Sequence, residues 1–196
     1  MPDAEIALFP LKSVLFPGGP LPLRIFEPRY VDMVSRCMKN NTGFGVLAIR
    51  SGSEVGEAVT FDTGTLAEIV SWHQDERGLL GIAARGRGRF ALQSTVRQAD
   101  GLYVGQVAWL TAEARMAVPD RYRPCADFVQ AVLPRLGSRY SNMDLDLDDA
   151  SWVGYRLAEI LPLELPVKQA LLELEDPIAR LERLQPALAR FRGTEA

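Results

Sequence analysis

The stretch from Leu8 to Met38, LFPLKSVLFPGGPLPLRIFEPRYVDMVSRCM, decides how this chain begins to fold. An apolar run ends at Pro10, and residues 16–20 (FPGGP) predict a tight turn, because proline fixes φ and glycine tolerates positive φ. In residues 21–25 (LPLRI) apolar side chains occupy every second position, which is the pattern of a half-buried strand. The stretch therefore predicts a strand, a chain reversal and a second strand.

Pro22 in the second strand must stand at an unpaired edge or a bulge, since proline has no amide N–H to donate.

A helix is predicted after this strand. Pro28 suits the first position of a helix. Apolar residues then recur at helical spacing along one side, namely Tyr30, Met33, Val34, Cys37 and Met38.

This opening resembles the start of the Lon protease N-terminal domain, a substrate-binding module that also occurs alone and within cereblon. The resemblance rests on Pro10, Leu11, Phe16, Pro17, Gly18, Leu21, Pro22, Leu23, Phe26, Glu27, Arg29 and Tyr30. It continues at residues 64–69, 86–90, 157–162, 168–173 and 180–184, so it covers nearly the whole chain. It implies a pseudo-barrel related to the PUA fold, with helices after it.

Composition indicates an ordinary globular protein. The 196 residues are 47% apolar and 24% charged, and no apolar run approaches the ~18 residues that a membrane-spanning helix needs. The N-terminus shows no targeting segment, so we expect a cytoplasmic protein with no membrane partner. Cys37 and Cys125 lie on apolar helix faces and are expected to be buried and reduced.

The middle of the chain predicts further strands separated by short turns. They are expected at residues 43–50, 58–61, 65–72, 79–84, 89–96 and 102–110. A series of this kind favours a small barrel, because closure removes exposed edges. The predicted fold class is α+β: an N-terminal PUA-like β pseudo-barrel with one inserted helix, followed by a C-terminal helical bundle.

The division between the two parts is predicted at residues 1–115 and 116–196. In the second part, Pro134 should kink or end a first helix, and Asp148 or Asp149 can cap the next. Pro166 opens another short helix, and Asp176-Pro177 reads as a cap followed by a first-turn proline.

Several motifs imitate ligand sites and fail on context. Residues 86–91 (GRGRFA) fit a loose dinucleotide fingerprint, but strand-like sequence continues after them, so a turn or bulge is the better interpretation. Residues 81–87 imitate a phosphate-binding loop with Arg87 where lysine belongs. The acidic run 144–149 lacks the glycine and glutamate of a calcium loop and suits the positive end of a helix dipole. We expect no cofactor.

No catalytic or metal site can be assembled from the sequence. His73 is the only histidine, and with Gln74, Asp75 and Glu76 it more simply marks a solvated hairpin tip. No nucleophile elbow is present, and neither cysteine can be paired with His73 by any sequence signal. The resemblance to Lon adds that its ATPase and peptidase domains have no counterpart before the chain ends at Ala196. The prediction is a protein that is not an enzyme.

One alternative function is RNA binding. Arg85, Arg87 and Arg89 are spaced by two, which predicts one strand face, and Arg97 could lie near them. Against this, the net charge is −3, and the arginines could instead answer acidic residues of the helical part. Nucleic acid is therefore the second hypothesis.

The first hypothesis is polypeptide binding, as the resemblance to the Lon N-terminal domain implies. We expect an apolar groove between barrel and helices that takes unfolded or exposed-hydrophobic segments, or a folded protein partner. The candidate contact residues are Phe26, Tyr30, Trp72, Trp109 and Trp152. The sequence leaves open whether the chain forms a homodimer, and a small-molecule enzyme is a third, weaker hypothesis.

Overall fold

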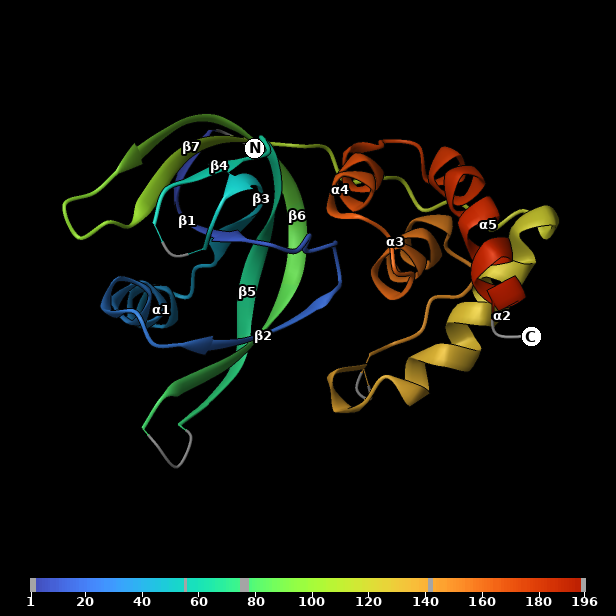
Figure 1. Ribbon diagram of the computed structural model, residues 1–196, viewed down its shortest axis with the longest axis horizontal. Helices are drawn as coiled ribbons and strands as arrows, with labels where there is room; N and C mark the ends of the chain where they lie inside the picture. The colour runs from blue at the N-terminus through green and yellow to red at the C-terminus, as the bar shows by residue number, and fades with distance from the viewer. Residues whose placement is uncertain (1–2, 55, 75–77, 141–142, 195–196) are drawn as a thin grey trace. The chain divides into compact units, whose positions relative to one another are not determined.

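The chain forms two compact units (Figure 1). The computed structural model describes residues 3–54, 56–74, 78–140 and 143–194, with only the backbone of residues 193 and 194. Unit 1 spans Met1–Ala112 and unit 2 spans Glu113–Ala196. Compactness does not show that each unit folds alone, so the division into domains at residue 115 stays a prediction.

Unit 1 is a sheet that closes on itself. Its elements are β1 (Ala4–Leu11), β2 (Pro20–Ile25), α1 (Pro28–Asn40), β3 (Phe44–Gly52), β4 (Ala58–Thr60), β5 (Thr63–Gln74), β6 (Leu80–Arg97) and β7 (Tyr103–Trp109). The order β1-β7-β6-β5-β3-β4 is joined by a parallel pairing of β1 with β3, which closes a ring of five strands, and β2 attaches to β6. The predicted β unit with one inserted helix is confirmed, although the barrel is irregular.

One long strand replaces two that the sequence predicts separately. Residues 79–84 and 89–96 both belong to β6, which runs without interruption through Gly86 and Gly88. Opposite β5, the pairing shifts from Ala67↔Gly86 to Thr65↔Arg89, so two residues of β6 face one of β5. The predicted turn or bulge at Gly86 is therefore a bulge, and the expectation of two strands was wrong.

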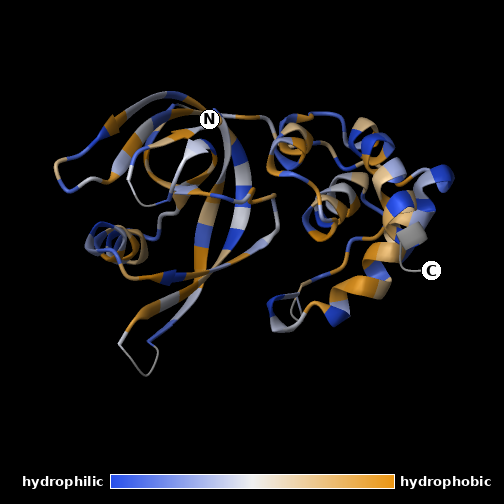
Figure 2. Ribbon diagram, viewed as in Figure 1, coloured by the Kyte–Doolittle hydropathy of each residue, from blue (hydrophilic) through white to orange (hydrophobic). Residues whose placement is uncertain are grey.

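Polar and apolar residues are mixed along β5 and β6 (Figure 2).

Helix α1 forms as its pattern predicts, with one exception. Pro28 stands in its first turn, and Tyr30, Met33, Val34 and Cys37 are buried. Met38 is 40% exposed, because eight residues of helix turn it about 80° away from Tyr30. The helix ends at Asn41, whose left-handed φ of 52° turns the chain toward β3.

The prolines of β2 remove two amide donors from its outer edge. Gly86 N–H donates to Gly19 O at 2.9 Å. Backbone groups of an antiparallel strand point to alternate sides, so those of Leu21, Leu23 and Ile25 point toward β6. Pro20 and Pro22 then face the open edge, where each presents a carbonyl but no amide donor. This confirms the prediction that Pro22 stands on an unpaired edge.

Unit 2 is helical. It contains α2 (Arg123–Val132), α3 (Ala150–Ile160), α4 (Leu165–Glu173) and α5 (Pro177–Thr194), with short 3-10 turns at Asp120–Tyr122, Leu133–Arg135 and Ser138–Tyr140. As predicted, regular helix stops before Pro134, and Asp149 caps α3 by accepting from Trp152 N–H at 3.3 Å. Asp176 likewise accepts from Ile178 N–H at 2.8 Å at the start of α5.

A buried ion pair holds the start of unit 2 to its last helix. The carboxylate of Glu113 accepts two bonds from Arg180, at 2.9 and 2.5 Å, and further bonds from Ser151 and Tyr155. Arg180 has no solvent exposure and also donates to the carbonyls of Leu171 and Leu174. The charge of Arg180 is thus matched within this cluster.

Among the residues that the structure describes, no helix is long and apolar enough to cross a membrane.

Candidate binding site

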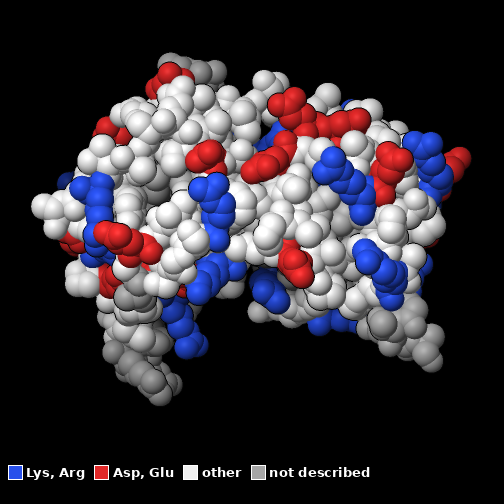
Figure 3. Space-filling model, turned by 45° about the horizontal axis from the view of Figure 1, so that its top comes forward, with Lys and Arg blue, Asp and Glu red and all other residues white. Residues whose placement is uncertain are grey.

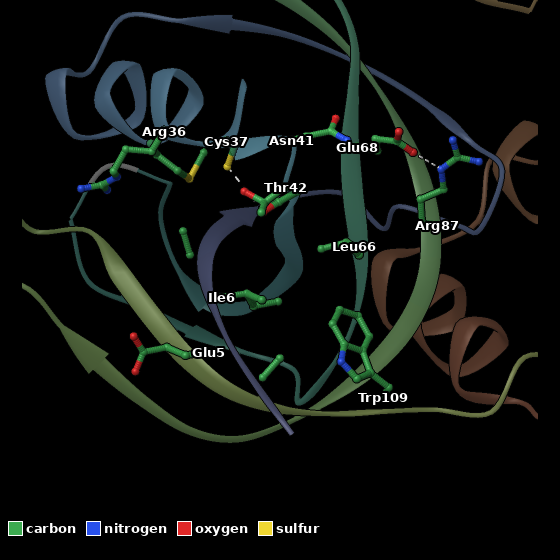
Figure 4. A pocket seen from close by; sticks show the side chains of 14 residues that line it. Glu5, Ile6, Arg36, Cys37, Asn41, Thr42, Leu66, Glu68, Arg87 and Trp109 are labelled. Carbon is green, nitrogen blue, oxygen red and sulfur yellow. Dashed lines mark hydrogen bonds and ion pairs between the residues drawn. The ribbon is translucent and has the colours of Figure 1, made fainter. Parts of the chain in front are cut away.

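A cavity of unit 1 lies beside the N-terminal half of β1 and has a volume of about 520 Å³ (Figure 4). One wall is the strand itself, since Ala4, Glu5, Ile6 and Ala7 all line the cavity. The opposite wall is the connection from α1 to β3 at residues 41–43. The cavity is therefore a slot between a strand and a helix-to-strand connection, and we call it the β1 slot.

Apolar side chains line the slot on both faces of the sheet. On one side, Ile6, Leu66 and Trp109 line it, and the Trp109 ring packs edge-on against Phe90 with centroids 6.3 Å apart. On the other side lie Met33 and Cys37 of α1. Apolar walls with a few polar groups at the rim are typical of sites that take a hydrophobic ligand.

The cysteine in the slot is not built as a nucleophile. Cys37 is buried, and its Sγ donates to Gly43 O at 3.4 Å. Burial raises the pKa of this thiol, with a smaller lowering effect from Thr42 and Arg36. A thiol held protonated at neutral pH attacks poorly. Both cysteines are buried, as expected.

Charged side chains stand at the rim. Arg87 donates to Glu68 across the β5–β6 bulge, and both side chains are about half exposed. Glu5 accepts from Gln106 on β7 at 2.9 Å, and Arg36 completes the rim from α1. Exposed pairs of this kind contribute little to stability but keep the mouth of the slot polar.

The five predicted contact residues do not gather in one place. Trp109 lines the β1 slot, whereas Phe26 and Tyr30 line a second cavity of about 110 Å³. Tyr30 is buried and stacks on Phe9 at 4.0 Å, while Phe26 is 66% exposed. Trp72 is 59% exposed on β5, and Trp152 is half-buried in α3 of unit 2. Their role in binding stays a prediction.

The arginines of the RNA hypothesis are separated by the bulge. In the ladder between β5 and β6, Arg85 lies opposite Glu68 and Arg89 lies opposite Thr65. The side chains of Arg85 and Arg89 therefore point to opposite faces of β6, and the expectation of one shared face was wrong. Arg89 is buried, and Arg87 is paired with Glu68. Arg97 is exposed and lies 5.8 Å from the ring of Tyr103. Basic and acidic side chains are interspersed on the face in Figure 3.

The acidic run of unit 2 serves its helices and neighbouring arginines. Asp146 pairs with Arg115 at 2.5 Å, Asp148 pairs with Arg123 at 3.0 Å, and Asp149 is the cap of α3. Within the described ranges, no group of three or more histidine, cysteine, aspartate and glutamate side chains could hold a metal ion. Asp75 and Glu76, the predicted neighbours of His73, lie outside those ranges.

One carboxyl in unit 2 has an unusual pKa. Burial raises the pKa of Glu159 from 4.5 to about 7, against the lowering effects of Arg156 and Lys168. Arg156 Nε lies 3.1 Å from this carboxylate, and the Tyr140 hydroxyl donates to it at 3.5 Å. Burial also raises the pKa of Tyr140 to about 12. These groups pack against one another inside the unit, which suits a structural role.

Comparison with known proteins identifies the family. The model of the ATP-dependent protease La (LON) substrate-binding domain matches residues 5–190. The chain belongs to this family. The matched region covers both units, and it confirms the resemblance stated from the sequence.

Solved structures agree with this membership. The crystal structure of a Lon N-terminal domain protein from Xanthomonas campestris has a TM-score of 0.79 and 34% identity, covering 93% of this chain and 98% of that chain. The N-terminal domain of Mycobacterium avium complex Lon protease has a TM-score of 0.64 at 15% identity, which shows the shared fold alone.

Named relatives are longer proteins. Cereblon from Xenopus tropicalis is 34% identical over 125 residues, which cover 62% of this chain and 25% of cereblon. Lon protease 2 from Myxococcus xanthus is 25% identical over 195 residues, which cover 95% of this chain and 24% of that protease. The chain thus spans about a quarter of the length of these two relatives.

The sequence-based reasoning missed most of the slot. Trp109 was the only predicted contact residue that lines it. Ala4 to Ala7, Thr42 and Leu66 carry no chemical signature, and they come together only because β1 pairs with β3 and β7. No local pattern in the sequence reports such a pairing.

Proposed function

We propose that this Lon substrate-binding domain is a non-enzymatic module that binds unfolded or exposed-hydrophobic polypeptide through the β1 slot of unit 1. The observation that carries the proposal is an apolar slot with Trp109 on its floor, in a family whose name describes substrate binding. Burial of apolar side chains from the polypeptide supplies the affinity. A cytoplasmic location suits the proposal, because two buried thiols stay reduced there.

The test is binding of the full chain to a permanently unfolded protein. Fluorescence anisotropy of labelled lactalbumin, reduced and carboxymethylated so that it cannot refold, should rise with added chain, and native lactalbumin should compete poorly. Trp109→Ala should weaken binding by about tenfold, equivalent to about 1.4 kcal/mol. Val96→Ala, at a site on β6 that is 67% exposed, is the matched control and should leave binding unchanged.

RNA binding remains the competing function, because Arg87 and Arg97 are exposed. A labelled oligonucleotide distinguishes the two, since affinity for RNA falls steeply with added salt whereas apolar binding does not. If only the oligonucleotide binds, and Arg97→Ala weakens it, the polypeptide proposal is wrong. If neither probe binds, a folded protein partner takes its place.

A further inference from the structure

The β1 slot lies where the pairing of two strands stops early. β1 pairs with β7 from Ala4 to Leu8, but its parallel pairing with β3 covers only Leu8 to Leu11. Before Gly45, the chain of β3 turns away toward α1 through residues 41–43. The place beside Ala4–Ala7 that β3 would fill if it continued is therefore occupied by the slot.

The slot meets the edge of β1, not one of its faces. Successive side chains of a strand point to opposite faces, so a cavity over one face touches every second residue. Ala4, Glu5, Ile6 and Ala7 are consecutive and all line this cavity. Among the described residues, β7 is the one strand whose register covers all of Ala4–Ala7, and β3 reaches this stretch only at the Ala7 carbonyl, beside the first parallel pair Leu8↔Gly45. The N–H and C=O groups of Glu5 and the N–H of Ala7 therefore face the slot without a strand to bond.

Two other open edges of unit 1, on β2 and β4, are less able to accept a strand. On β2, Pro20 and Pro22 leave Arg24 as the one amide donor of the open edge. β4 has only three residues, Ala58–Thr60. The edge of β1 at the slot contains no proline.

The slot has room for a short extended segment. From a rise of 3.3 Å per residue, a strand spacing of 4.8 Å and a sheet separation of 10 Å, one strand residue occupies about 160 Å³. The volume of about 520 Å³ then holds about three residues. Alternate side chains would meet Leu66 and Trp109 on one side and Met33 and Cys37 on the other.

We propose that an extended polypeptide segment with consecutive apolar residues binds in the β1 slot by adding a strand to the free edge of Ala4–Ala7. This inference rests on the proposed function and specifies its substrate. Apolar walls on both sides select side chains that are apolar on both faces of the strand. Such runs form strands buried on both faces in folded proteins, so unfolded chains expose them. Backbone bonds supply affinity without a fixed sequence, as in other cases of strand addition.

The test uses the full chain and a labelled nonapeptide, Ile-Val-Phe-Val-Ile flanked by two lysines at each end. A second peptide carries the same side chains but is methylated on every core backbone nitrogen. Strand addition requires the methylated peptide to bind at least about tenfold more weakly, equivalent to about 1.4 kcal/mol. Equal binding of the two peptides overturns strand addition and leaves polypeptide binding standing.

Hydrogen exchange followed by NMR locates the bonds. Saturation with the unmethylated peptide should slow exchange by about tenfold at amides within Ala4–Ala7 that exchange quickly in the free chain. Thr42→Trp, which places an indole at the mouth of the slot, should abolish binding, and Val96→Ala should not. If Trp72→Ala abolishes binding while Thr42→Trp does not, the peptide binds at Trp72 and the slot is excluded. If unfolded lactalbumin also fails to bind the wild-type chain, the proposed function itself is wrong.

Discussion

The largest fully buried side chains of unit 1 are apolar, whereas those of unit 2 include Arg156 and Arg180. Unit 1 packs an apolar cluster on each face of its sheet and leaves a stretch of the β1 edge without a partner strand. Unit 2 surrounds its arginines with carboxylates and carbonyls. An apolar interior tolerates an unfinished ladder at its margin, but a buried charge requires its partner. We therefore expect binding to belong to unit 1 and sensitivity to single polar substitutions to belong to unit 2.

The largest effect is expected in unit 2 on removal of Glu113. Burial alone would raise the pKa of Glu113, but bonds from Arg180, Ser151 and Tyr155 outweigh it and lower the pKa, so the carboxylate is charged at neutral pH. Glu113→Ala leaves the buried Arg180 guanidinium without its ion pair and should lower the free energy of unfolding by about 3–5 kcal/mol. Urea denaturation followed by circular dichroism measures this. Glu182→Ala, at an exposed position of α5, is the control, and an equal small loss in both variants would contradict the comparison.

In unit 1, we expect the free energy of unfolding to be most sensitive to added side-chain atoms where two backbone segments approach closely. Gly86 and Gly88 of β6 test this. A Cβ on Gly86 would lie 2.2 Å from Phe16 O, whereas a Cβ on Gly88 meets nothing within 4 Å. Gly86→Ala should lower the free energy of unfolding by about 1–3 kcal/mol through overpacking. Gly88→Ala should change it by less than about 0.5 kcal/mol. Equal effects in denaturation experiments would show that close approach at Gly86 is not what holds the loop before β2.

An effect that appears only as a pH dependence is expected at Glu159. With a pKa raised to about 7, its carboxyl keeps a proton in the folded state at pH values where the unfolded chain has released it. Its contribution to the free energy of unfolding therefore falls as pH rises from about 4.5 to about 7. Glu159→Gln removes this titration, so the variant should gain stability relative to wild type as pH rises across that interval. Denaturation curves at several pH values check this, and a difference between the two proteins that does not vary with pH would contradict it.

The sequence predicted what local rules control. Proline positions, the cap at Asp149 and the apolar side of α1 follow from the chemistry of neighbouring residues, and the structure confirms them. The glycines at positions 86 and 88 predicted a break between two strands, because the alternation of apolar residues does not reveal a bulge within one strand. The same bulge moved Arg85 and Arg89 to opposite faces.

Long-range partners could not be predicted. Arg180 is buried because Glu113 reaches it across 67 positions of sequence, and the predicted boundary at residue 115 would have separated the two. The β1 slot depends on where a parallel pairing between β1 and β3 stops. Family resemblance supplied the fold and suggested the class of function that we propose, but not the location of a site.

The most direct test of the central claim is photo-crosslinking between the full chain and unfolded, carboxymethylated lactalbumin that carries a photoreactive group, with the crosslinked residues identified by mass spectrometry. We expect crosslinks at Ala4–Ala7, at Thr42 and at Trp109, and competition by the apolar nonapeptide. Crosslinks confined to unit 2 or to the strand around Trp72, with none in the β1 slot, would contradict the account.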